Sequence, residues 1–201
     1  MTALVLAAGL VAADVRVGAS APALPCAAAA ARAYAHGGGR SVRVAEEDAR
    51  AGTSDAFVGV AFEVTRLVEA GLADPKTETE LARIPWVLSG APLPAGGLQA
   101  LAGREVALPD ARWSFEAERA VERVAGAQAR HESDADTLRR APLALLPLSM
   151  APLADVAPVE IPPLTIAGAV RRSATAPMEA AAFLNYLATQ RGQSLFTECG
   201  R

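Results

Sequence analysis

The stretch GTSDAFVGV at residues 52–60, with RLVEAGLADP following at residues 66–75, decides the fold of this chain. Residues 55–60 are almost continuously apolar, which is typical of a short strand buried on both faces. Residues 62–70 place Phe62, Arg66 and Glu69 at helical steps, and Gly71 is a typical helix stop. A buried strand that runs into an amphipathic helix indicates an α/β architecture.

The same alternation of strand and helix continues on both sides of this stretch. Ser114 is a candidate N-cap for a helix that runs to about residue 125, and Gly192 is the expected end of the last helix. Pro142 and Pro147 restrict one strand to a sheet edge or to a short piece. The pattern predicts strands at 15–18, 41–44, 84–88, 104–108, 143–148 and 165–170, and helices at 25–35, 114–125 and 177–190.

Composition limits the classes of protein to which the chain can belong. The 201 residues are 52% hydrophobic and carry a formal net charge of -3. A chain this apolar can bury a core, and it lacks the clustered Lys and Arg that nucleic-acid binding requires. We therefore expect a globular protein with no nucleic-acid partner.

The N-terminus and the two cysteines bear on location. Residues 1–13 are apolar and end in Val11-Ala12-Ala13, which are suitable for signal-peptidase cleavage before Asp14. This favours a periplasmic protein, although the segment carries no Lys or Arg and an uncleaved first strand is the alternative. Cys26 and Cys199 either form one disulfide, as an oxidising compartment allows, or remain two free thiols.

No catalytic, cofactor or metal motif is apparent. The glycines at 37–39 follow a helix and lack the Lys of a phosphate loop, so they are interpreted as a helix end. His36 and His131 are far apart in sequence, and Ser149 does not lie in a G-x-S-x-G turn. We expect a protein that is not an enzyme and that has no cofactor and no metal site.

Three stretches together resemble the periplasmic molybdate-binding proteins, which are two-lobed solute-binding proteins of ABC importers. The first is the strand and serine-bearing turn at 15–24, and the second is the opening pair of segments, 52–58 and 66–75. The third comprises residues 159–163, 166–170, 180–187 and 193–196, which are similar to the family's return strand and final helices.

The resemblance implies a two-lobed α/β fold of the type II periplasmic-binding-protein class, with a ligand cleft between the lobes. The Gly- and Pro-rich turn at 90–97 is the expected crossing between them. Residues 14–89 and 163–201 would then form lobe 1, residues 90–162 would form lobe 2, and residues 1–13 are the candidate signal peptide.

The resemblance also names candidate ligand-binding residues. It implies that the turn at Ser20 and Ala21 and a backbone donor at Ser114 bind an oxyanion, and Trp113 could cover the cleft floor or stack on an organic ligand. The chain departs from the family at 44–50, where Glu46 and Glu47 replace a serine-rich turn, and near Pro147, where the family has a tyrosine.

The acidic turn leaves two possibilities for the ligand. If Glu46 and Glu47 face the cleft, their charges disfavour a dianion and the site should prefer a cation or a neutral molecule. If they point into solvent, as adjacent charges on a turn usually do, oxyanion binding survives.

Two functional hypotheses follow. The first is a monomeric extracytoplasmic protein that binds a small molecule or oxyanion and delivers it to the membrane subunits of an ABC transporter. The alternative is a binding-protein fold that now acts as a sensing or protein-interaction module with a different ligand.

Overall fold

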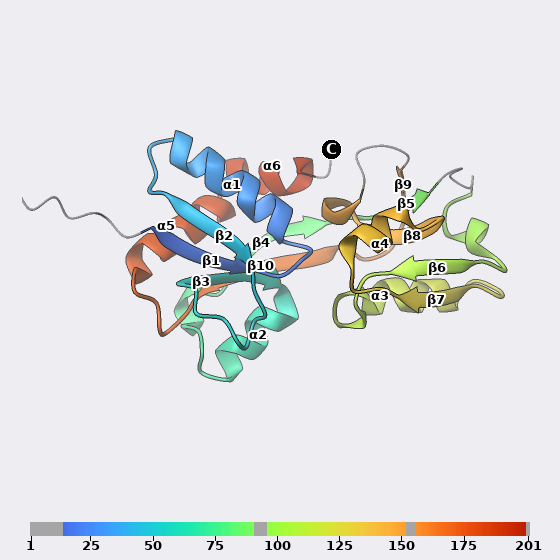
Figure 1. Cartoon of the computed structure of the whole chain (residues 1–201), viewed down its shortest axis with the longest axis horizontal. Coiled ribbons are helices and arrows are strands. Elements are labelled where there is room, and N and C mark those ends of the chain that lie inside the picture. The colour runs from blue at the N-terminus through green and yellow to red at the C-terminus, as the bar shows by residue number, and fades with distance from the viewer. Residues whose placement is uncertain (1–13, 91–95, 152–155, 200–201) are drawn as a thin grey trace, which may run out of the picture.

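The structure, a computed structural model, describes residues 14–90, 96–151 and 156–199. These residues form two five-stranded sheets that lie in two lobes side by side (Figure 1). The predicted α/β class is confirmed. The candidate signal peptide at residues 1–13 lies outside the described residues.

The sheet of the first lobe is mixed, with β1 parallel to β2 and β3 and with β10 antiparallel to β3 and β4. The β3 strand is buried along its whole length, as its apolar sequence predicts. The strand order is β2 (Val42–Glu46), β1 (Val15–Ala19), β3 (Ala56–Val60), β10 (Leu164–Val170) and β4 (Thr79–Ile84).

Helices cover both faces of this sheet. Figure 1 shows α1 (Leu24–His36), α5 (Pro177–Ala188) and α6 (Gln190–Glu198) on one face and α2 (Ala61–Glu69) on the other. The alanines of α1 allow close packing against the sheet, and Ala27 and Ala30 are fully buried. On the other side, Val64 and Leu67 of α2 pack with Phe57.

The second lobe has a smaller mixed sheet between α3 (Ala111–Glu122) and α4 (Ala135–Arg140). Of the two possibilities for residues 143–148, the structure shows a short strand in the sheet interior and not at an edge. Its two prolines lie just before and at the end of the strand, so neither breaks the ladder. The strand order is β7 (Gln128–His131), β6 (Glu105–Leu108), β8 (Leu143–Pro147), β5 (Trp86–Gly90) and β9 (Val156–Pro158).

The chain changes sheet twice. It leaves the first sheet after β4, passes through Pro85 and enters the second sheet as β5. It returns between β9 and β10, through residues 159–163. The first change therefore comes before the turn predicted at 90–97, of which residues 91–95 lie outside the described part of the chain. The expected strand at 84–88 is in fact the junction of two strands, one in each sheet.

The sequence predicts one last helix at 177–190. The structure has two helices there, α5 and α6, joined by a tight turn. Thr189 follows α5 and caps α6 by accepting a hydrogen bond from Gly192 N at 3.2 Å. Gly192 therefore lies inside α6, and the prediction that it ends the last helix is wrong. A Cβ at this position would collide with the backbone of Tyr186 and Leu187, so glycine permits the close approach of α6 to α5.

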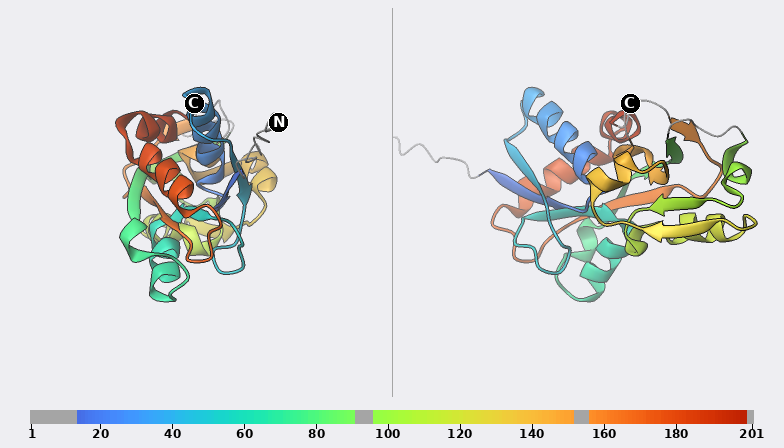
Figure 2. Two further views of the ribbon diagram at one scale, coloured as in Figure 1. Left: turned by 90° about the vertical axis from the view of Figure 1, so that its left-hand side faces the viewer. Right: turned by 45° about the vertical axis from the view of Figure 1, so that its right-hand side comes forward.

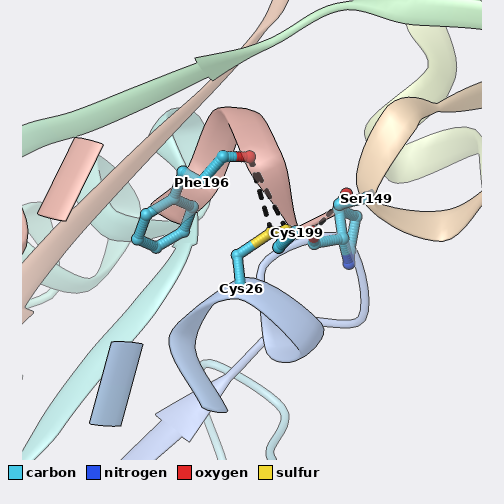
Figure 3. The surroundings of a disulfide bond; sticks show 5 residues. Cys26, Ser149, Phe196 and Cys199 are labelled. Carbon is cyan, nitrogen blue, oxygen red and sulfur yellow. Dashed lines mark hydrogen bonds between the residues drawn. A yellow bond between two sulfur atoms is a disulfide. The ribbon is translucent and has the colours of Figure 1, made fainter. Parts of the chain in front are cut away.

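The two cysteines form a disulfide between the N-terminal and C-terminal parts of lobe 1. Cys26 on α1 is bonded to Cys199, directly after α6 (Figure 3). The two helices lie side by side, as the views in Figure 2 also show. Of the two alternatives that the sequence left open, the structure therefore has the paired cysteines.

Candidate ligand-binding site

A small cavity of about 160 Å³ lies between the lobes, and five of the six predicted site residues line it. Ser20 and Ala21 follow β1, Glu46 and Glu47 lie at the end of β2, and Trp113 comes from the start of α3. The parallel register pairs Ala19 with Glu46, so the turn after β1 and the end of β2 meet at the same sheet edge. The other lining residues are Asp48, Glu63 and Arg112.

Ser20 has a buried hydroxyl with unused hydrogen-bonding capacity. The residue is only 4% exposed, and its Oγ has no hydrogen-bond partner within the described residues. Its backbone is fully used, because Ser20 N donates to Val58 O and Ser20 O accepts from Ala23 and Leu24. An unsatisfied buried hydroxyl costs about 1–3 kcal/mol, so this group is suited to bonding a solute.

Ser114 is the predicted site residue that does not line the cavity. The N-cap of α3 is Asp110, whose carboxylate accepts from Arg112 N at 2.9 Å, so the helix begins before Ser114. The Ser114 hydroxyl is buried and donates to Pro109 O at 3.1 Å. The expectation that Ser114 caps the helix is wrong, because two candidate caps lie four residues apart and the earlier one is used.

Glu47 lines the cavity, but its negative charge is neutralised by a buried arginine. Arg171, whose side chain is 3% exposed, donates from Nη2 to Glu47 Oε1 at 2.7 Å and to Ala49 O at 2.8 Å. Ser54 Oγ donates to the same carboxylate oxygen at 2.7 Å. Glu47 is thus part of a partly buried ion pair that fixes the acidic turn onto the sheet.

Glu46 differs from its neighbour. It is exposed, and no ion pair to its carboxylate is found within the described residues. Of the three acidic residues of this turn that line the cavity, Glu47 and Asp48 are thus paired with Arg171 and Arg112, and Glu46 has no ion pair among the described residues.

The start of α3 connects the two lobes across the cavity. Trp113 Nε1 donates to Glu63 Oε1 on α2 at 2.9 Å, while Glu63 Oε2 accepts from Val60 N at 3.1 Å. Glu63 is 9% exposed, so burial strengthens this contact. Glu63 was not among the predicted site residues, although a glutamate at the third position of a helix is a recognisable capping signal.

Arg112 makes a second connection between the lobes. Its guanidinium forms a two-pronged contact with Asp110, at 3.1 Å for both pairs of atoms, and it lies 3.5 Å from Asp48 of lobe 1. The hydrogen bonds from Arg112 hold the pKa of Asp110 below its usual range. The same guanidinium lies over the Trp113 ring, 5.1 Å from the centroid.

A third connection lies beside the disulfide. Ser149, in the short helix η3 (Leu148–Met150) of lobe 2, donates to Pro22 O of lobe 1 at 2.7 Å (Figure 3). Both the turn that carries Ser20 and the acidic turn are thus tied to lobe 2.

Two further hollows adjoin the small cavity. One of about 700 Å³ extends along α2 and includes Phe62, Leu72 and Arg112. The other, of about 240 Å³, lies at the return crossing and is lined by Trp113, Phe115 and Pro162, among others. Arg112 borders all three spaces.

Residues 14–90, 96–151 and 156–199 offer neither a metal site nor a membrane-spanning helix. No group of three or more His, Cys, Asp or Glu side chains there is placed to hold a metal ion. No helix in the same residues is both long enough and apolar enough to cross a bilayer.

Comparison with known proteins relates this arrangement to solved structures. No protein-family profile matches the chain, and no curated protein matches it by sequence. The periplasmic molybdate-binding protein of Azotobacter vinelandii superposes with a TM-score of 0.73 at 14% identity, covering 93% of this chain and 97% of that one. The chain has the periplasmic-binding-protein fold.

Two more structures support this fold. The substrate-binding domain of a molybdenum ABC transporter from Clostridium difficile has a TM-score of 0.68 at 15% identity and covers 93% of this chain and 97% of its own. Iron-bound HitA from Pseudomonas aeruginosa has a TM-score of 0.63 at 17% identity, with 91% and 83% covered. The predicted type II class with a cleft between two lobes agrees with the structure, and at these identities the likeness defines the fold alone.

Proposed function

We propose that this chain is an extracytoplasmic solute-binding protein that holds a small solute between its lobes for the membrane subunits of an ABC transporter. The buried, unpartnered hydroxyl of Ser20 in the cavity between the lobes carries this proposal. Binding sites of this kind place a few polar groups in a concave, mostly closed space. The Cys26–Cys199 disulfide supports an extracytoplasmic location, because such bonds persist in oxidising compartments.

The size of the cavity limits the ligand. A volume of about 160 Å³ is below the roughly 300–1,000 Å³ of sites for drug-sized molecules, so the solute is small. The three structures reported above are named for molybdenum, molybdate and iron, and another structure of this fold, PEB3, is named with bound L-phospholactate. They support solute binding in general, and the ligand class has to be inferred from the residues that line this cavity.

A thermal-denaturation screen tests the proposal. Refolded, ligand-free protein is heated with single additions of molybdate, tungstate, sulfate, ferric citrate and a set of small organic solutes. A solute that binds the folded state raises the melting temperature, by the equivalent of about 2.7 kcal/mol at one hundred times its Kd.

The variant Ser20→Ala should lose this stabilisation and retain its fold, because it removes only an unpartnered hydroxyl. Ser89→Ala is a matched control, since Ser89 is also buried but lines none of the three hollows. No stabilisation by any solute, or equal stabilisation of the Ser20→Ala protein, would contradict the proposal.

A second candidate function is a sensing or protein-interaction module built on the same fold. It is favoured by Phe62 and Leu72, which are exposed apolar side chains bordering the 700 Å³ hollow beside the cleft. Neighbouring genes discriminate the two. Importer membrane and ATPase subunits favour transport, whereas a sensor kinase favours this alternative.

A further inference from the structure

The charges around the small cavity are unbalanced. Four carboxylates line it, from Glu46, Glu47, Asp48 and Glu63, and Asp110 adds a fifth that is paired with Arg112. Among the described residues, the guanidiniums of Arg112 and Arg171 pair with members of this set, and the charge of Arg50 acts on Asp48. Five acidic groups against three basic groups leave a formal excess of two negative charges. In a partly closed space this excess raises the free energy of a bound dianion and lowers that of a cation.

The helix ends at the cavity are also poor anion sites in this chain. A bound anion normally uses the free N–H groups of a helix start. At α2 the Val60 N–H is taken by Glu63, and at α3 the Arg112 N–H is taken by Asp110. At α1 the second residue is Pro25, which has no N–H. At α2 and α3 the chain thus directs one of its own carboxylates to an N–H group that an oxyanion would otherwise use.

Two residues that line the cavity have polar side-chain groups without a partner among the described residues. The Glu46 carboxylate has no ion-pair partner in the described structure, and the Ser20 hydroxyl is buried without a partner. A carboxylate and a hydroxyl oxygen both accept hydrogen bonds from an ammonium group.

We propose that the solute bound at Ser20 is a small organic cation, an amine whose ammonium group donates to Glu46 and Ser20, and not an oxyanion. This inference rests on the proposed solute-binding function and specifies its ligand class. It also answers the question raised by the acidic turn, because Glu46 and Glu47 line the same cavity as Ser20.

Isothermal titration calorimetry at constant ionic strength tests the inference. Ethanolamine, 1,4-diaminobutane and tetramethylammonium are titrated as chlorides, and molybdate, tungstate and sulfate as sodium salts, into ligand-free full-length protein. We expect binding of at least one primary amine and no binding of the three anions. Tetramethylammonium cannot donate a hydrogen bond, so it should bind more weakly than the primary amines.

Two charge-removing variants locate the ammonium group. Glu46→Gln should weaken binding of the amine roughly 10–100-fold, as expected for loss of a charge-assisted hydrogen bond. Glu122→Gln removes the same charge from an exposed position of α3 outside the cavity and should leave the affinity unchanged.

The outcomes separate this inference from the proposal on which it rests. Binding of an oxyanion without an amine, or equal effects of Glu46→Gln and Glu122→Gln, would overturn the cation inference and leave solute binding intact. If none of the six compounds gives heat, the cation inference is overturned. The same result would contradict binding of these six solutes by the protein.

Discussion

Glu47 shows how a single residue of the acidic turn is neutralised, and which small residues make this possible. Its carboxylate meets Arg171 in a space bounded by Gly18 and Gly52. A Cβ on Gly52 would overlap the Glu47 carboxylate and lie 2.5 Å from Arg171 Nη2. Glycine at position 52 therefore leaves the room in which Glu47 and Arg171 form their ion pair.

Replacing Gly52 should uncouple this pair. We expect Gly52→Ala to lower the free energy of unfolding by about 3 kcal/mol, because displacement of Glu47 leaves the Arg171 charge buried without its partner. Urea denaturation measures the loss. Gly37→Ala is the control, since a Cβ there meets only the carbonyl oxygens of Ala33 and Tyr34 at an ordinary 3.4 Å. A Gly52→Ala protein as stable as the control would contradict this role.

At the scale of elements, Asp55 joins the start of β3 to β1 and to the segment that precedes α5. Its buried carboxylate accepts from Arg16 N at 2.9 Å, and from Thr175 N at 2.7 Å and Thr175 Oγ1 at 2.8 Å. Burial alone would raise the pKa of Asp55, but these hydrogen bonds outweigh it and the pKa lies below its ordinary value. The aspartate of the opening stretch is thus a structural link within lobe 1.

This link gives a prediction for acid stability. Since the folded pKa of Asp55 is below its unfolded value, its contribution is complete above about pH 4 and is lost as the pH falls through the folded pKa. Asp55→Asn should reduce stability at neutral pH and flatten the loss of stability below about pH 4. Urea denaturation from pH 2.5 to pH 7 measures both effects. A variant with the wild-type acid profile would show that other carboxylates cause it.

The disulfide is the second link at this scale, between α1 and the end of α6. Removing it with the double variant Cys26→Ala, Cys199→Ala should cost about 2–5 kcal/mol of stability, because the bond closes a long loop between residues 173 apart in sequence. Reducing agent should lower the melting temperature of the wild type and leave the double variant unchanged. Two alkylatable thiols in the native protein would contradict the paired state.

At the scale of the whole molecule, local patterns predicted most strands and helices, since their signals lie within a few residues. The buried run at 55–60 and the amphipathic segment at 62–70 correspond to β3 and α2. The contacts that build the cavity depend on distant segments. Arg171 meets Glu47 across 124 positions, and Trp113 meets Glu63 across 50. No local sequence pattern predicts such long-range contacts. The family resemblance predicted Ser20 and Ala21 as site residues, but neither Glu63 nor Arg112.

The central claim is that a solute binds at Ser20 between the lobes, and amide hydrogen exchange tests it most directly. The solute that stabilises the protein most in the thermal screen is added at saturation, and exchange is compared with that of the free protein. The account predicts slower exchange in both lobes, at residues 20–21 and 46–48 of one and 112–113 of the other. Protection confined to one lobe, or centred on the hollow beside Phe62 and Leu72, would contradict it.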